Sequence, residues 1–340
     1  MSLRNRVNGK VLKDKMRSSD EARTTLSFYK YHHIPDTGML RDELYREWSD
    51  IDALGRIYLA TEGINAQLSV PTTSFEDLKK MIYGIPFLDG IRLNTAVDDN
   101  GKSFFKLKIL VRKKIVADGI SDPKFDVTDS GAHVNAEEFN KLADQPETII
   151  VDMRNHYESE VGHFKNAITP DADTFRDELN LVTNILEGKQ DKNVIMYCTG
   201  GIRCEKASAW MKHNGFNHVF QLDGGIIEYA RQVKEKGLEN KFIGKNFVFD
   251  ERLGERISDD IVSACHQCGK PCDDHTNCKN DGCHLLFIQC EECAKKYENC
   301  CSQQCTDIIQ LPQEQQKEIR KGVNKGRQVF RKGRAKNINH

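Results

Sequence analysis

The stretch Cys198-Thr-Gly-Gly-Ile-Arg-Cys-Glu205 holds the residue types of an anion-binding nucleophile site. Two glycines and an arginine follow a cysteine, so that backbone N–H groups and a guanidinium gather around one sulfur. Such a loop favours the thiolate, and the thiol pKa should fall. We therefore predict that Cys198 is the catalytic nucleophile and Arg203 its anion-stabilising partner, within a loop that also comprises Thr199, Gly200, Gly201, Ile202 and Cys204.

Two other interpretations of this loop stay open. Cys198 can be a small buried apolar residue in an ordinary turn between a strand and a helix. Cys204 can be a resolving thiol for an oxidised or persulfidated Cys198, or only a small residue at the start of the helix.

A second set of chemically active residues is the group of ten cysteines between Cys265 and Cys305, out of twelve in the chain. Two CxxC pairs interleaved with further cysteines are typical of tetrahedral thiolate zinc. We predict two structural zinc ions in a crossed arrangement. The first would be held by Cys265, Cys268, Cys290 and Cys293, and the second by Cys278, Cys283, Cys301 (or Cys300) and Cys305, with Cys272 and His284 as substitutes. A disulfide knot and an iron–sulfur site are the alternatives.

Composition and charge narrow the class of protein. The chain has 340 residues, 38% of them hydrophobic, and a net charge of −1. No apolar run reaches the length of a membrane span, and the basic N-terminus lacks the apolar centre of a secretory signal. We therefore expect a cytoplasmic protein with no membrane partner. After Gln316 the chain carries nine cations and a single acid, Glu318, which favours contact with a nucleic acid; a solvated basic terminus is the alternative.

Strands and helices alternate from Thr24 to about Asp118 in the order strand, helix, strand, strand, helix, strand. This order predicts a ferredoxin-like α+β sandwich whose last strand is 105–111. The turn around Glu62-Gly-Ile-Asn65 joins its two middle strands. Glu62 and Asn65, with Gln67, are candidates for the wall of a substrate cleft, whereas a hairpin turn that needs Gly63 is the structural alternative.

The following 110 residues alternate strands with helices and predict a parallel α/β domain. A capping box at Asn135 opens its first helix. Cys198 follows the strand 193–197, at the carboxyl end where ligands of such sheets bind. Asp152 and Arg154 follow another strand and are further cleft candidates.

These patterns predict an α/β protein of several domains. We expect a basic N-terminal tail (1–22), a ferredoxin-like (acylphosphatase-like) domain (23–118), a linker (119–130), a parallel α/β domain (131–240), a connector (241–264), a cysteine-rich metal-binding module (265–306) and a basic C-terminal tail (307–340).

The central motifs resemble the rhodanese (sulfurtransferase) domain. They are Asp152-x-Arg154-x3-Glu158, Gly162-His163, Cys198-x2-Gly201-x-Arg203 and Leu222-x-Gly224-Gly225. In that family the loop cysteine carries a persulfide. The four residues between Cys198 and Arg203 match sulfur-handling rhodaneses, whereas the related phosphatases have one more. Cys204 departs from the usual Ser or Ala.

Over residues 24–310 the chain resembles the bacterial rhodanese-like tRNA uridine-34 hydroxylases. The resemblance rests on Glu62-Gly-Ile-Asn65, on the loop from Cys198 to Lys206 and on Cys-His-Gln-Cys268-Gly-Lys-Pro-Cys272. It implies oxygen-dependent formation of 5-hydroxyuridine at the wobble position of tRNA, with molecular oxygen as co-substrate and Cys198 essential. Cys198 would attack carbon 6 of uracil or carry a persulfide. The alternatives are a sulfurtransferase that takes sulfane sulfur from thiosulfate or a sulfur-donor protein, and a non-catalytic RNA-binding scaffold.

Overall fold

A computed structural model describes residues 7–97, 99 and 101–321. The predicted RNA-contacting cations beyond residue 321 lie outside the described residues. The contacts within the chain divide it into two compact units. The first unit comprises Met1–Ile150, Leu186–Glu239 and Phe249–Arg252, and the second comprises Val151–Ile185, Asn240–Val248 and Leu253–His340. The N-terminal sheet and the Cys198 loop therefore belong to the same unit.

The N-terminal part of the first unit is the predicted ferredoxin-like sandwich. After helix α1 (Gly9–Arg17), its elements are β1 (Arg23–Tyr31), α2 (Thr37–Asp50), β2 (Leu54–Ala60), β3 (Gly63–Pro71), α3 (Phe75–Tyr83) and β4 (Asn94–Thr95), with short 3-10 turns at Thr72–Ser74 and Pro86–Leu88. A further strand, β5 (Leu107–Val111), completes a sheet with the order β4-β1-β3-β2-β5.

The predicted last strand, 105–111, is present as β5, but it is not the strand that completes the ferredoxin-like order. The strand that pairs with β1 in the ferredoxin-like order is the two-residue β4. β5 lies at the opposite edge and runs parallel to β2. A strand of two residues, such as β4, is too short to show an alternation of apolar and polar residues. The longer β5 was therefore predicted to be the last strand.

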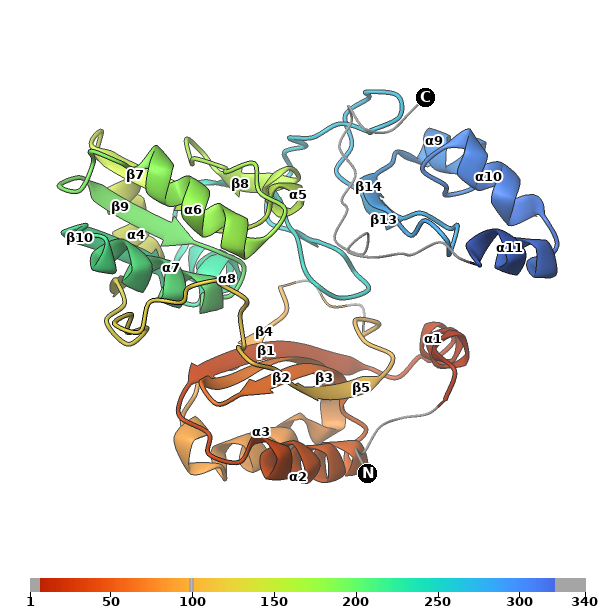
Figure 1. Ribbon diagram of the computed structural model, residues 1–340, viewed down its shortest axis with the longest axis horizontal. Coiled ribbons are helices and arrows are strands. Elements are labelled where there is room, and N and C mark those ends of the chain that lie inside the picture. The colour runs from red at the N-terminus through yellow and green to blue at the C-terminus, as the bar shows by residue number, and fades with distance from the viewer. Residues whose placement is uncertain (1–6, 98, 100, 322–340) are drawn as a thin grey trace. The chain divides into compact units, whose positions relative to one another are not determined.

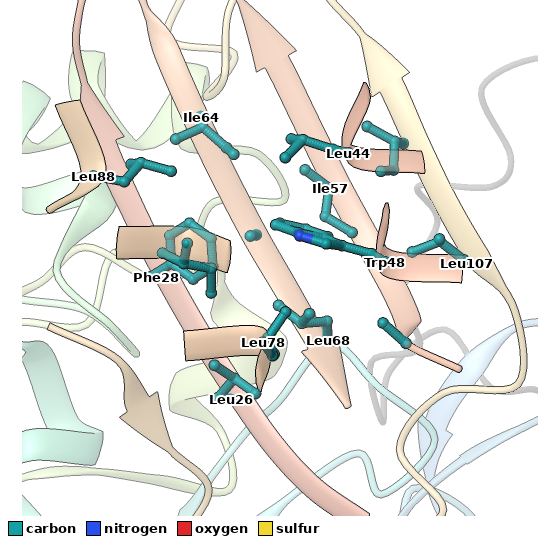
Figure 2. Close-up of a cluster of buried hydrophobic side chains, with 14 of the residues drawn as sticks. Leu26, Phe28, Leu44, Trp48, Ile57, Ile64, Leu68, Leu78, Leu88 and Leu107 are labelled. Carbon is teal, nitrogen blue, oxygen red and sulfur yellow. The ribbon is translucent and has the colours of Figure 1, made fainter. Parts of the chain in front are cut away.

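Helices α2 and α3 cover one face of the sheet (Figure 1). Alternate residues of each strand point to that face. Leu26 and Phe28 of β1 pack there with Trp48 of α2 and Leu78 of α3, as Figure 2 shows. The rings of Phe28 and Trp48 meet edge to face, 6.4 Å apart. The intervening residues of the strands therefore point to the other face.

The turn between β2 and β3 is shorter than predicted. Ile64 and Asn65 pair with Leu59 and Tyr58, so they belong to β3 and not to the turn. Gly63 has φ 146°, and a Cβ there would lie 2.1 Å from the carbonyl oxygen of Lys30. The predicted need for glycine at this position is confirmed.

A parallel sheet carries the Cys198 loop. Its order is β6-β10-β9-β7, formed by β6 (Ala132–Val134), β10 (His218–Leu222), β9 (Asn193–Tyr197) and β7 (Thr148–Asp152). Helices α4 (Ala136–Ala143) and α7 (Ile202–His213) each join two of these strands, and α8 (Gly225–Lys236) follows β10. Asn135 and Glu138 form the predicted capping box at the start of α4.

The second unit contains a small antiparallel sheet of order β12-β11-β8. Its elements are α5 (His156–Ser159), β8 (Gly162–Phe164), α6 (Phe175–Ile185), β11 (Phe242–Asn246), β12 (Glu255–Arg256), the hairpin β13 (His275–Asn277) and β14 (Leu286–Ile288), then α9 (Glu291–Lys296), α10 (Gln303–Gln310) and α11 (Gln313–Arg320). Across the described residues, we find no helix with the length and apolar character that a membrane crossing requires.

Candidate active site

The Cys198 loop joins buried strand β9 to helix α7. Gly201 adopts φ 96°, which turns the chain into the helix. The Gly201 N–H donates to Cys198 Sγ over 3.2 Å. From behind, the first amides of α8 hold the loop, because Ile226 N donates to the carbonyl of Cys198 (3.0 Å) and Ile227 N to that of Thr199 (3.2 Å). The predicted gathering of backbone N–H groups around the cysteine is present.

The electrostatics of the loop favour a thiolate on Cys198. Burial raises its pKa, but hydrogen bonding with Cys204, the charge of Arg203 and the backbone N–H groups of both residues outweigh it. The pKa falls from 9.0 to about 6. Burial and the neighbouring Cys198 raise the pKa of Cys204 well above 9.0. At neutral pH the loop therefore holds one thiolate and one thiol.

Arg203 lies against the loop that it was predicted to close. Its guanidinium lies 3.4 Å from Thr199 Oγ1 and 5.8 Å from the centre of the Phe249 ring. Only 8% of the residue is exposed. A guanidinium held in this way lowers the pKa of Cys198 and can stabilise an anion that forms at the loop.

Cys198 itself is completely buried in this conformation, with 0% exposure. The loop backbone reaches the surface at Gly200, which is half-buried. A substrate atom can therefore meet the sulfur only after the groups that cover it move.

A cavity of about 500 Å³ lies beside the loop, within the first unit. Its lining combines aromatic, cationic and hydroxyl side chains; it includes Tyr29, Tyr31, Arg92, Thr128, Ser130, His133, Gly200, Glu205, Asp223 and Gly224. Tyr29 and Tyr31 meet edge to face with ring centres 6.3 Å apart. Aromatic faces together with hydrogen-bonding groups are what a splayed-out nucleobase requires.

Glu205 organises the floor of this cavity. It accepts hydrogen bonds from Tyr29 Oη (3.1 Å) and Gln221 Nε2 (3.0 Å) and lies 3.0 Å from His133 Nε2. Burial raises the pKa of Glu205, but the interactions with His133 and Gln221 outweigh burial, so the pKa of Glu205 is lowered overall. The hydrogen bond to Glu205 raises the pKa of His133. The pair is therefore biased toward a carboxylate and an imidazolium.

Most of these cavity residues were missed by the sequence analysis. Tyr29 and Tyr31 are two residues apart on one strand, which places them on one face and was a usable signal. Arg92, His133 and Glu205 come from three separate segments. Only the packing of the N-terminal sheet beside the loop brings them to one cavity.

Glu62, a predicted cleft residue, is bound to Lys206 of α7. Lys206 Nζ lies 2.9 and 3.0 Å from the two Glu62 oxygens and 2.5 Å from Asp118 Oδ2. Glu62 also accepts from the Ile115 N–H over 2.7 Å. These contacts indicate that Glu62 anchors the helix that follows the Cys198 loop. Asn65 is half-buried on the sheet face away from α2 and α3.

Asp152 and Arg154, the other predicted cleft residues, form a fully buried pair in the second unit. Arg154 donates to the two Asp152 oxygens over 2.8 and 2.6 Å and to the carbonyl of Gly162 over 2.6 Å. Both side chains have 0% exposure. Their contacts indicate a structural role and give no support to a role in a cleft.

The cysteine-rich part of the second unit contains two sets of four sulfurs. They are Cys265, Cys268, Cys290 and Cys293, and Cys278, Cys283, Cys301 and Cys305; within each set the ligand atoms lie within 4.8 Å of one another. The grouping matches the predicted one, without Cys272, His284 or Cys300.

The spacing within these sets suits a tetrahedral metal site. The sulfurs of Cys268 and Cys290 are 3.6 Å apart, as are those of Cys283 and Cys301. A Zn–S bond of about 2.3 Å in a tetrahedron places sulfurs about 3.8 Å apart. The Asn280 amide (3.4 Å) also donates to Cys305 Sγ, as outer partners of thiolate ligands do. Both sets could hold a metal ion.

Comparison with known proteins finds three successive matches along the chain. Three family models match it: the UPF0176 acylphosphatase like domain over residues 23–115, the Rhodanese-like domain over 135–232 and Rhodanase C-terminal over 243–306. Among solved structures, a rhodanese-related protein from Thermoplasma volcanium is 25% identical, with 32% of this chain and 99% of that chain covered and a TM-score of 0.25.

Curated relatives match nearly the whole chain. A protein of Photorhabdus laumondii is 54% identical over 98% of this chain and 95% of its own. For proteins of Pectobacterium carotovorum and Salmonella heidelberg, the identities are 56% and 55%, over 98% of this chain and 94% and 96% of theirs. All three are named tRNA uridine(34) hydroxylase. With this identity over almost its full length, the chain belongs to the tRNA uridine(34) hydroxylase family.

Proposed function

We propose that this protein hydroxylates uridine 34, the wobble base of tRNA, to 5-hydroxyuridine, with molecular oxygen as co-substrate. The observation that carries the proposal is the 54–56% identity to hydroxylases over 98% of the chain. The low-pKa Cys198 and the neighbouring cavity supply a nucleophile and a place for a base.

The residues of the first unit have separate parts in this reaction. Tyr29 and Tyr31 would hold the uracil in the cavity, and the Glu205–His133 pair would bind its polar edge. The loop would then open and let the Cys198 thiolate attack carbon 6, which makes carbon 5 nucleophilic toward oxygen. Arg203 and the loop amides would stabilise the developing anion. A persulfide on Cys198 is the competing intermediate.

The electron balance assigns a role to Cys204. One oxygen atom enters the base and the other leaves as water, which consumes two electrons and two protons. The Cys198 thiolate and the Cys204 thiol would supply two electrons and one proton when they close a disulfide, water would supply the second proton, and an external thiol would then reduce the disulfide. The hydrogen bonding between the two sulfurs supports this pairing. One Cys198–Cys204 disulfide per 5-hydroxyuridine is expected in a single turnover without reductant; repeated turnover by Cys204→Ser would contradict it.

Mass spectrometry of tRNA nucleosides tests the proposal as a whole. Pure protein incubated with tRNA in air should form 5-hydroxyuridine, and the product should be absent under nitrogen or with Cys198→Ser. A tRNA that carries 5-fluorouridine at position 34 should trap Cys198 on the base, because fluorine blocks the loss of a proton from carbon 5. Hydroxylation by Cys198→Ser would exclude both the attack and the persulfide.

Sulfur transfer is the second candidate, favoured by the match to the Rhodanese-like domain and the four residues between Cys198 and Arg203. It predicts turnover of thiosulfate with cyanide in the absence of tRNA. Such turnover without any 5-hydroxyuridine would replace the hydroxylase proposal.

We further propose that zinc fills both cysteine sets. Four thiolates leave no open position for catalysis, so these ions would fold the module and take no part in the reaction.

A further inference from the structure

The face of the N-terminal sheet away from α2 and α3 carries two rows of side chains that suit single-stranded RNA. Strand register defines them. Tyr29 lies opposite Asn65, which lies opposite Tyr58. In the next row Gln67 lies opposite Arg56, which lies opposite Lys108. We call this surface the tyrosine face; it comprises Tyr29, Arg56, Tyr58, Asn65, Gln67 and Lys108.

The tyrosine face has the composition of an RNA-stacking platform. Tyr58 and Asn65 are half-buried, so the ring and the amide are held by the sheet but remain partly open. Neighbouring strands are about 4.8 Å apart, which places the Tyr29 and Tyr58 side chains two strand spacings from each other. Aromatic residues on the exposed face of a four-stranded sheet stack RNA bases in other folds of this shape.

The charge of the tyrosine face is complementary to a phosphate backbone. Arg56 and Lys108 are exposed neighbours on adjacent strands. Burial lowers the pKa of Lys108, and the neighbouring cations Arg56 and Lys106 lower it further. A third cation, Arg112, lies 5.8 Å from the centre of the Tyr58 ring. A cluster of cations beside aromatic rings fits a polyanion with stacking bases.

The tyrosine face is continuous with the cavity beside the Cys198 loop. Tyr29 belongs to the tyrosine face, where it lies next to Asn65, and it also lines the cavity. An RNA strand whose one base enters the cavity therefore has its neighbouring bases over the sheet.

We propose that the tyrosine face binds the anticodon loop of the substrate tRNA and stacks the bases next to uridine 34. This inference rests on the proposed function for the identity of the RNA.

Binding of a labelled tRNA transcript to the full-length chain, measured by fluorescence anisotropy, tests the tyrosine face. Arg56→Ala combined with Lys108→Ala should weaken binding about tenfold and reduce the slope of log K against log salt by about 0.7 for each cation removed. The matched control is Arg46→Ala combined with Lys80→Ala, which removes one arginine and one lysine from exposed positions on α2 and α3. The control should bind like the wild type.

Stacking is tested separately at Tyr58. Tyr58→Ala should weaken binding about 5- to 100-fold, whereas Tyr58→Phe keeps the ring and should stay within twofold. In nucleoside assays, the Arg56/Lys108 and Tyr58→Ala variants should raise KM and leave kcat nearly unchanged. Thermal melting verifies that each variant is folded.

The outcomes separate this inference from the proposed function. Wild-type affinity, salt slope and KM in all these variants, with 5-hydroxyuridine still formed, would overturn the tyrosine face alone. Lost tRNA binding in these variants, with a wild-type protein that forms no 5-hydroxyuridine, would support the face and overturn the proposed reaction.

Discussion

At the scale of the residue, Cys198 combines two properties that usually oppose each other. It is completely buried, which favours the thiol, and yet its pKa is lowered from 9.0 to about 6. Hydrogen bonding with Cys204 and the charge of Arg203 reverse the effect of burial. The residues that lower the pKa of Cys198 could be found in the sequence, because they follow it within six positions of the chain.

The pH dependence of Cys198 alkylation follows from that pKa. Only the thiolate reacts, and only while the groups that cover Cys198 are displaced. The rate with iodoacetamide should therefore be low, but it should rise through about pH 6 and level off above about pH 7. Cys204→Ala removes a hydrogen bond that lowers the pKa, so its profile should move to higher pH, whereas Cys204→Ser keeps a donor and should stay close to the wild type. Peptide mass spectrometry gives the rates. A wild-type midpoint near pH 9 would refute the assignment of a thiolate.

At the scale of the element, the start of α8 determines the shape of the Cys198 loop. Gly225 has φ 66°, and a Cβ there would lie 2.5 Å from the carbonyl oxygen of Cys198 and 2.6 Å from that of Thr199. Any larger residue must displace the loop from behind.

A non-glycine residue in the left-handed backbone conformation costs about 1–3 kcal/mol by itself. Gly225→Ala should lower the free energy of unfolding by more than this, because the added Cβ also displaces the loop. Gly215→Ala is the matched control, since Gly215 also has positive φ, 85°, but open space around it. Urea unfolding should show a larger loss for Gly225→Ala. Its Cys198 alkylation midpoint should also shift, whereas that of Gly215→Ala should not. Equal losses would show that the contact with the loop has no effect.

Local patterns made most elements predictable, and packing decided the rest. β10 and the end of α8 were predicted at their observed residues because apolar periodicity and flanking glycines are local signals. The pairing of cysteines into two sets followed from their spacing alone. In contrast, the partner of Glu62 is 144 positions away, at Lys206, and no local pattern marks such a pair. The cavity residues were missed for the same reason.

At the scale of the whole molecule, Lys206 ties the N-terminal sheet to helix α7 within the first unit. Its side chain is 1% exposed and lies between Glu62 and Asp118. Lys206→Met should destabilise this unit by roughly 3–5 kcal/mol, because it leaves two carboxylates without their shared cation. Lys114→Met removes the other cation beside Asp118, but that side chain is 38% exposed and its loss should cost much less. Chemical denaturation compares the two, and equal losses would contradict the anchoring role.

The second unit should depend on metal. Two zinc ions per chain are expected by elemental analysis, and Cys268→Ser should reduce this to about one. Cys300→Ser is the matched control, because Cys300 is buried nearby but belongs to neither set. Chelation should unfold the cysteine-rich module, because in the proposal bound zinc supplies its folding free energy. Full metal content in Cys268→Ser would exclude the proposed ligand set.

The burial of Cys198 has a consequence for the proposed reaction with oxygen. A thiolate exposed at the surface is readily oxidised to sulfinic acid, and few proteins have an enzyme that reverses this oxidation. While Cys198 stays buried, the resting protein should withstand peroxide, and binding of tRNA should make Cys198 vulnerable to it. Damage would then accompany turnover and spare the idle enzyme.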